Sequence, residues 1–231
     1  MKNKMIAKSI SFAMEKIDIH EFVSSLITAL ESKDPYTSGH SERVSELSER
    51  LAIEIGFDEE QTFIVHISAH LHDIGKIGIR DSILHKPGRL EREEIIEIQR
   101  HPQIGYEILR KVKTFRRIAL IVKHHHERFD GKGYPDGLKG EEIPIESRII
   151  AVADSFDAMV SPRPYRREMN IEEAMKEISN HSGEQFDPEV VAVIQRLYQE
   201  EPEFFSKLVP TPIMKYEGVE HESILHSRRI G

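Results

Sequence analysis

Histidine and aspartate side chains gather in a few short stretches of this sequence. The pair His72-Asp73 and the run His124-His125-His126 are accompanied by His40 and His101, and Asp154 adds a carboxylate within an apolar stretch. Imidazole and carboxylate groups together suit iron, manganese or zinc, and one carboxylate can bridge two ions. Because the 231 residues include no cysteine, thiolate ligands and a cysteine nucleophile are both excluded.

The spacing of these residues is compatible with more than one set of ligands. His66, His70 and Asp73 stand at positions i, i+4 and i+7, which places them on one face of a helix. Such a face could hold a metal ion without His72. Spacing alone leaves both sets open, and a histidine at a single position is more often a packed or surface residue.

Composition limits the classes of partner. The formal net charge is -8, from 40 acidic and 32 basic residues, which argues against binding to a DNA or RNA polymer. Aromatic residues make up 7% of the chain, and tryptophan is absent, so a base-stacking platform is disfavoured. The sequence has no apolar run of about 20 residues and no signal-peptide pattern, so we expect a cytoplasmic protein without a membrane span.

The elements that must position these side chains are helices, because apolar residues recur at helical spacing and strand patterns are scarce. Residues 22–30 and 44–55 each predict a helix with one apolar face, and Gly56 ends the second. Asp58 is predicted to cap a third helix, which stops at Gly75 and Gly78.

Further along, glycines and prolines separate the later helices. Residues 104–112 and 114–126 predict two helices, and residues 128–144 predict a loop. Later helices are predicted to begin near Pro144, Asn170 and Asp187. We therefore expect one all-α domain over residues 20–200. Residues 1–19 would form an N-terminal helical extension that dimerises or connects, and residues 201–231 an irregular or partly disordered tail.

Several motifs resemble those of one family. Residues 70–79 (HLHDIGKIGI) and 85–88 (HKPG) resemble the signature of HD-domain phosphohydrolases. Residues 125–135 (HHERFDGKGYP) resemble the defining motif of the HD-GYP subfamily, and residues 148–158 (RIIAVADSFDA) and 163–166 (RPYR) continue its pattern in order. The resemblance runs from about residue 34 to residue 187. It implies a single HD-type helical bundle with a binuclear metal site.

The resemblance also implies roles for particular residues. One metal ion would be held by His40, His72, Asp73 and Asp154, and a second by His101, His125 and His126, with Asp73 bridging. Lys76 would lie against the scissile phosphate or the bridging solvent, although a cation that satisfies helix-end carbonyls is the alternative. His66, His70 and His124 fall outside the motif and would be packing or surface residues.

Substrate contacts are implied around the Gly-Tyr-Pro motif. Gly133 would allow close backbone approach, Tyr134 and Pro135 would line the cleft or dock a partner domain, and Arg163 and Arg166 would hold the second phosphate or a guanine edge. The chain departs from the family at two positions. Tyr36 replaces a glutamate that holds a third metal in some members, so we expect two metals. Pro162 stands where an aspartate is frequent.

The implied function is metal-dependent hydrolysis of cyclic di-GMP to pGpG, with GMP as a further product, by attack of a metal-bridging hydroxide. The cofactors would be two divalent metal ions per chain, with iron and manganese favoured. The alternatives are an HD phosphohydrolase for another nucleotide phosphoester and a non-catalytic cyclic-dinucleotide receptor. A homodimer or a regulatory protein partner would supply any control.

Overall fold

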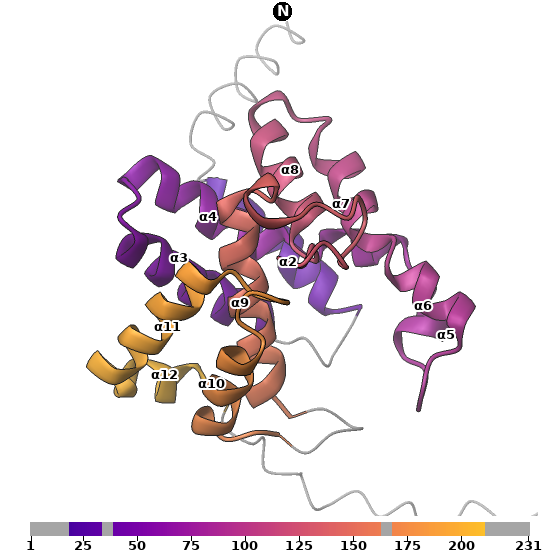
Figure 1. Ribbon diagram of the computed structural model, residues 1–231. Helices are drawn as coiled ribbons and strands as arrows, with labels where there is room; N and C mark the ends of the chain where they lie inside the picture. Colours follow the sequence, from indigo (N-terminus) through magenta and orange to yellow (C-terminus); the bar gives the residue numbers. More distant parts are fainter. Residues whose placement is uncertain (1–18, 34–38, 163–167, 211–231) are drawn as a thin grey trace, which may run out of the picture.

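The computed structural model describes residues 19–33, 39–162 and 168–210, and this part of the chain is built from helices (Figure 1). The α-helices are α2 (Ile19–Glu31), α3 (His40–Ile55), α4 (Glu59–Leu71), α5 (Asp81–Leu84), α6 (Arg92–Ile98), α7 (His101–Leu109), α8 (Arg116–His124), α9 (Ile145–Val160), α10 (Ile171–Asn180), α11 (Pro188–Glu200) and α12 (Pro202–Leu208). Short 3-10 helices are η2 (Ile74–Gly78), η3 (Lys113–Phe115) and η4 (Gly140–Glu142). Within the described ranges there is no strand, so the all-α prediction is confirmed.

Capping residues set several helix boundaries where the sequence placed them. The Asp58 carboxylate accepts a hydrogen bond from the Gln61 amide at 2.8 Å, and the Gln61 side chain accepts one from the Asp58 amide, which starts α4. Asn170 begins α10 in the same way. Gly56 ends α3 with φ of 101°, a left-handed conformation that other residues rarely adopt.

Several boundaries differ from the sequence prediction, and α7 spans His101–Leu109 rather than residues 104–112. Helix α4 ends at Leu71 rather than near Gly75, because the chain tightens into the 3-10 helix η2. The segment after Pro202 was expected to be irregular, but it forms α12. Phe205 of α12 is fully buried, and its ring centroid lies 5.5 Å from that of Phe156, so burial of this aromatic side chain orders the short helix.

Two clusters of buried apolar side chains form the core. One is made mainly by α3, α9, α10, α11 and α12, and the other by α2, α7 and α8. Helices α4 and α8 contribute to both clusters; Ala69 of α4 belongs to the first and Leu71 to the second. The C-terminal ends of α4 and α8 are therefore held from two sides, which makes them rigid supports for the residues that follow.

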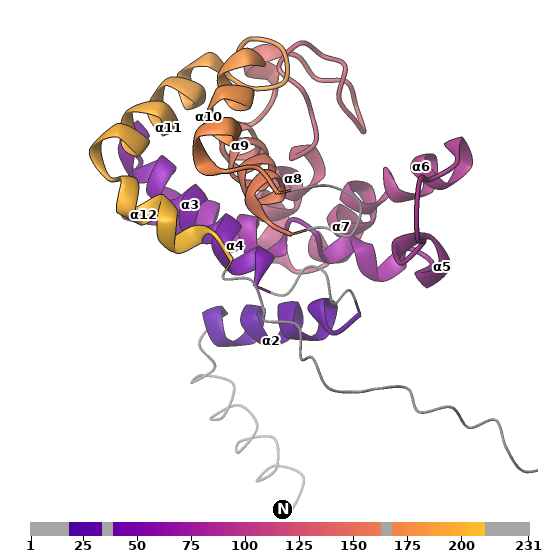
Figure 2. The same ribbon diagram turned by 90° about the horizontal axis from the view of Figure 1, so that it is seen from below.

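Three helices lie at the periphery. Helix α2 runs across one side of the bundle, whereas α5 and α6 extend away from the body (Figure 2). No helix of the described ranges is long and apolar enough to cross a lipid bilayer. Apart from Ile19, the predicted N-terminal extension lies outside the described residues, as does the tail from residue 211 onward.

Candidate metal centre

The seven residues to which the resemblance assigned metal binding lie together, mostly at helix ends. We call them the paired centre: His40, His72, Asp73, His101, His125, His126 and Asp154. Helices α3 and α7 begin at His40 and His101, whereas α4 and α8 end directly before His72 and His125. Asp154 stands in the middle of α9, which lies centrally in the bundle (Figure 1). Four helix ends and one helix side thus converge.

Three of the histidines are oriented by the same backbone contact. In His72, His101 and His125, Nδ1 donates a hydrogen bond to the carbonyl oxygen of the residue three positions earlier. The acceptors are Ala69 (2.6 Å), Ile98 (2.8 Å) and Val122 (2.6 Å). Because a carbonyl oxygen only accepts, Nδ1 carries the hydrogen, and Nε2 of the neutral ring keeps a lone pair.

These Nε2 atoms form two close pairs. Nε2 of His40 lies 3.3 Å from Nε2 of His72, and Nε2 of His101 lies 3.3 Å from Nε2 of His125. Two nitrogens bound to one ion at about 2.1 Å lie roughly 3.0–3.4 Å apart. Each pair is thus spaced as two ligands of one metal ion.

Asp73 lies between the two pairs. Its Oδ2 is 3.4 Å from Nε2 of His72 and 3.8 Å from Nε2 of His40, whereas its Oδ1 is 3.3 Å from Nε2 of His101. Asp154 approaches the first pair, with Oδ1 at 3.4 Å from Nε2 of His40. Since each oxygen of Asp73 faces a different pair, the carboxylate has the position of a bridge.

His126 lies beside the second pair and next to the predicted substrate loop. Its ring centroid lies 4.0 Å from that of His125 and 5.0 Å from that of His101. The ring of Tyr134 lies 4.9 Å away from His126. Tyr134 of the Gly-Tyr-Pro motif is thereby placed directly beside the paired centre.

The carboxylates create a field that favours positive charge. Burial opposes a proton on His72, but Asp73 and Asp154 outweigh burial and raise the pKa of His72 to about 9. Burial would raise the pKa of Asp73, but Lys76, His72 and His101 reverse this effect and hold that pKa well below its usual range. A field that favours a proton here would also favour a divalent cation.

Three other histidines of the paired centre, His101, His125 and His126, behave differently. Burial lowers the pKa of His101 to about 3, although Asp73 acts in the opposite direction. Burial, followed by the neighbouring histidines, also lowers the pKa of His125, and burial lowers that of His126. These rings are therefore neutral near pH 7, the form in which imidazole binds metals.

A second aspartate of α9 fixes the orientation of His40. Oδ2 of Asp157 lies 2.7 Å from Nδ1 of His40, and Arg43 Nε donates a hydrogen bond to Asp157 Oδ1 at 2.5 Å. Sequence reasoning gave Asp157 no role. The signal was its position three residues after Asp154, which puts both carboxylates on one side of the helix.

Close backbone contact brings Asp73 and His101 together. A Cβ atom on Gly75 would lie 1.8 Å from the carbonyl oxygen of His101 and 2.6 Å from the amide nitrogen of Gly105. No side chain fits in that space, so η2 packs directly against α7. This contact lies two residues from Asp73 and thereby sets its distance from His101.

The Gly-Tyr-Pro loop is held from inside by a buried carboxylate. Glu127 accepts hydrogen bonds from the backbone amides of Asp136 (2.8 Å), Gly137 (3.1 Å) and Leu138 (3.1 Å). A Cβ atom on Gly133 would lie 2.3 Å from the Arg128 amide nitrogen, so the close approach expected at this position is present. Sequence reasoning missed the role of Glu127, although the residue belongs to the motif.

Lys76 lies beside the bridging aspartate. Its Nζ is 2.6 Å from Oδ2 of Asp73, and its side chain keeps 21% of its exposed surface. The lysine side chain is therefore partly exposed, and its ammonium group is paired with the Asp73 carboxylate. Its contact with a substrate phosphate stays a prediction.

Other predicted residues are not part of the paired centre. His124 contacts Asp136, with Nε2 at 3.0 Å from Oδ2. His66 and His70 group with His20 rather than with Asp73, so the alternative ligand set is not assembled. Arg163, Arg166 and Tyr36 lie outside the described residues. Pro135 follows Tyr134 in the loop and is exposed.

The donor set fits metal ions. The described residues include His40, His72 and Asp73 as one group of converging donors and His101, His125 and His126 as another. Nitrogen and oxygen donors with a bridging carboxylate suit iron, manganese and zinc.

Comparison with known proteins gives matches over most of the chain. The sequence profile of the HD-domain family matches residues 24–190. The chain belongs to the HD-domain family. It is 46% identical over 178 residues to the cyclic di-GMP phosphodiesterase response regulator RpfG of Xanthomonas campestris pv. campestris, covering 76% of this chain and 47% of that protein. The resemblance to the HD-GYP subfamily is confirmed.

Two other matches extend the comparison. A cyclic di-GMP phosphodiesterase of Thermotoga maritima is 42% identical over 214 residues, covering 92% of this chain and 56% of that protein. The crystal structure of a cyclic GMP-AMP specific phosphodiesterase of Vibrio cholerae superimposes with a TM-score of 0.63 at 26% identity, covering 83% of this chain and 51% of that one. This chain therefore spans about half the length of the curated relatives that it matches.

Proposed function

We propose that this chain hydrolyses a cyclic dinucleotide and converts cyclic di-GMP to linear pGpG, with GMP as the product of a second cleavage. The observation that carries this proposal is the position of Asp73, whose two oxygens face two separate groups of histidine nitrogens. The relatives at 46% and 42% identity are named cyclic di-GMP phosphodiesterases, which supports the substrate.

Two divalent metal ions, iron or manganese, would occupy the paired centre. His40, His72, Asp73 and Asp154 would hold one ion, and His101, His125 and His126 the other, with Asp73 shared. When bound, such ions activate water and neutralise charge on the phosphoryl oxygens. The preference for iron or manganese rests on the mixed imidazole and carboxylate donors and the absence of cysteine.

The chain's own groups would position the phosphodiester. The Lys76 ammonium, 2.6 Å from Asp73 Oδ2, would pair with a non-bridging phosphoryl oxygen. Burial, followed by Asp154 and Asp73, raises the pKa of Tyr134, so its hydroxyl stays protonated and can donate a hydrogen bond to substrate. Gly133 and Pro135 would shape the wall around it, and Arg163 and Arg166 would hold the second phosphate or a guanine edge.

The reaction needs no protein nucleophile. Water attacks phosphorus opposite the 3′ oxygen, the bond from phosphorus to that oxygen breaks, and the leaving oxygen takes up a proton. The product carries a 5′ phosphate and a 3′ hydroxyl, which is the linear dinucleotide. Repetition at the second phosphodiester would give GMP.

The test is anaerobic loading of the full chain with Fe²⁺ or, separately, Mn²⁺, followed by incubation with cyclic di-GMP and chromatography of the products. We expect pGpG or GMP from the parent chain and none from Asp73→Ala, which should also bind less metal. Parallel incubations with 3′3′-cGAMP and with nucleoside triphosphates measure specificity.

Two outcomes would overturn the proposal. Marked preference for a nucleoside triphosphate would assign the chain to a different phosphoester. Binding of cyclic di-GMP without turnover, in a sample with metal at the paired centre, would make the chain a receptor.

A further inference from the structure

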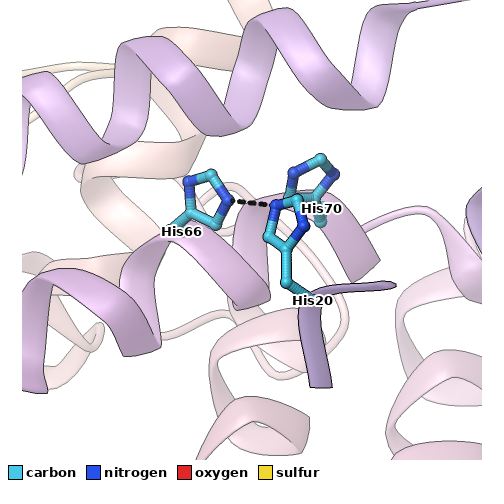
Figure 3. A group of neighbouring side chains, drawn as sticks. All are labelled: His20, His66 and His70. Atoms are coloured by element: carbon cyan, nitrogen blue, oxygen red, sulfur yellow. Dashed lines mark hydrogen bonds between the residues drawn. The ribbon is translucent and has the colours of Figure 1, made fainter. Parts of the chain in front are cut away.

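Three histidines outside the paired centre converge between α2 and α4. We call His20, His66 and His70 the second histidine cluster. His20 lies in the first turn of α2, and the other two lie one turn apart on α4 (Figure 3). One ring nitrogen from each histidine lies within 4.8 Å of the others, and Nε2 of His20 is 3.2 Å from Nε2 of His66.

Hydrogen bonds fix the tautomer of His70. The Ser45 hydroxyl donates its hydrogen to the Glu42 carbonyl oxygen at 2.7 Å, so its oxygen accepts from His70 Nε2 at 2.9 Å. The other nitrogen, Nδ1, therefore carries a lone pair. His70 is 1% exposed, and its Nδ1 has no hydrogen-bond partner in the described part of the chain. A buried acceptor without a donor is costly, and a cation would satisfy it.

A carboxylate orients His66. Oε2 of Glu49 lies 2.7 Å from Nδ1 of His66, close but poorly aligned for a hydrogen bond. Two acceptors do not approach so closely, so Nδ1 carries the hydrogen and Nε2 keeps a lone pair directed at His20. Metal-binding histidines are commonly held by a carboxylate on the opposite nitrogen in this way.

One metal ion can bind a nitrogen of each of the three histidines, whereas one proton can link only two of them. A hydrogen on His20 can be shared with His66, but it leaves Nδ1 of His70 without a donor. The separation of 3.2 Å between the first two nitrogens also matches two ligands of one ion. We propose that His20, His66 and His70 bind one transition-metal ion, with zinc as the preferred ion.

The chemistry of the cluster selects the ion. Three imidazoles without a carboxylate between them suit Zn²⁺, Cu²⁺ or Ni²⁺ rather than Mg²⁺ or Ca²⁺. His20 and His66 also line a cavity of about 530 Å³ with Glu49 and the apolar side chains of Ile53, Phe57 and Phe63. The cavity leaves room for water or a small ligand at a fourth coordination position.

The proposed ion would join two parts of the chain. His20 precedes residues 24–190, which match the HD-domain profile, whereas His66 and His70 lie within them. Helix α2 otherwise rests on the domain through apolar contacts that include Val23 and Ile27. Zinc would therefore connect α2 to α4.

The test is zinc uptake by the full chain after removal of all metals, measured as zinc per chain and as the shift in melting temperature. His20→Ala is the main variant, because His20 is only half-buried and alanine is a good helix former. His181→Ala, at a histidine outside both clusters, is the matched control. We expect His20→Ala to bind one zinc fewer than the parent, and the control to bind the same number.

A second variant and a spectrum guard against a folding artefact. His66→Gln, checked by circular dichroism, should lose the same zinc as His20→Ala. Cobalt in place of zinc should give visible absorption bands that both variants diminish. Equal zinc uptake and an equal melting shift in parent and His20→Ala would overturn the proposal, whatever the chain hydrolyses.

Discussion

Helix α4 carries His66 and His70 of the second histidine cluster and ends directly before His72 of the paired centre, but the rings of the two sites are held by different means. In the paired centre, backbone carbonyls three residues earlier hold His72, His101 and His125. In the second cluster, Ser45 and Glu49 side chains hold His70 and His66. The backbone contacts persist when side chains change, whereas the side-chain contacts depend on two residues.

The two sites also differ in where their carboxylates lie relative to the histidines. Asp73 lies between the histidines of the paired centre, so it can join two ions. Glu49 contacts His66 at Nδ1, the nitrogen opposite the one that lies near His20, so the second cluster is suited to a single ion. The position of the carboxylate, between the histidines or beside them, thus distinguishes the two-metal centre that we propose from the one-metal site that we propose.

The largest expected effect comes from breaking the paired centre alone. Asp154→Asn removes the anionic oxygen 3.4 Å from His40 Nε2, and we expect a loss of cyclic di-GMP hydrolysis of roughly 1,000-fold or more. Zinc uptake at the second histidine cluster should be unchanged. Initial rates and zinc per chain measure the two effects, and a joint loss of both would contradict the separation of the sites.

A smaller effect is expected from the carboxylate behind His40. Asp157→Asn keeps the shape but weakens the contact with His40 Nδ1, which is 2.7 Å in the parent chain. We expect metal affinity at the paired centre or turnover to fall by roughly 10-fold to 100-fold. Titration with Mn²⁺ and the rate at saturating metal separate these two causes. Metal affinity and turnover equal to those of the parent chain would show that His40 does not need the Asp157 carboxylate.

One buried histidine of each cluster should respond in the same way to acid when all metals are removed. Burial lowers the pKa of His101 to about 3, and burial, followed by His66, lowers that of His70 to about 4. Because an unfolded histidine has a pKa of about 6.5, the unfolded chain binds more protons as the pH falls below that value, and folding loses stability. Each ring contributes a loss of about 2 kcal/mol between pH 7 and pH 5.

Variants at either cluster test that expectation. His101→Asn and His70→Asn should each make the loss of stability between pH 7 and pH 5 smaller in the presence of EDTA. The free energy of unfolding in urea at the two pH values is the measurement. His72 acts in the opposite direction, since its pKa of about 9 favours folding at low pH and loses that contribution as the pH rises from about 6.5 to 9. An unchanged pH dependence in both variants would contradict the assignment.

The smallest expected effect comes from the carboxylate of the second histidine cluster. Glu49→Gln should weaken zinc binding there by about 10-fold, because the amide supports His66 less strongly than the carboxylate does. Hydrolysis of cyclic di-GMP should stay at the parent rate. Competition with a zinc chelator of known affinity measures the change, and a larger effect on hydrolysis than on zinc binding would show that the clusters are coupled.

The sequence predicts the paired centre better than it predicts the contacts that support it. The order of the motifs joins His40, His72 and His101 into one set. The roles of Asp157 and Glu127 depend on which partners face them after folding. His20 and His66 stand 46 positions apart, and no local spacing connects them.

The errors in the predicted helix boundaries also arise from contacts that form only after folding. Helix α12 was missed because Pro202 and its short length suggest a chain end, whereas burial of Phe205 against Phe156 orders it. The end of α4 was placed too late because Gly75 and Gly78 look like helix terminators. The structure shows that Gly75 is required for contact with α7, and the helix has already ended at Leu71.

That contact at Gly75 has a consequence for how the chain can vary. The carbonyl oxygen of His101 lies 1.8 Å from the position that a Cβ atom on Gly75 would take. Any side chain there would separate the segment carrying Asp73 from the start of α7, and the carboxylate would then reach only one set of histidines. The two-ion centre that we propose therefore depends on a residue that offers no ligand atom of its own.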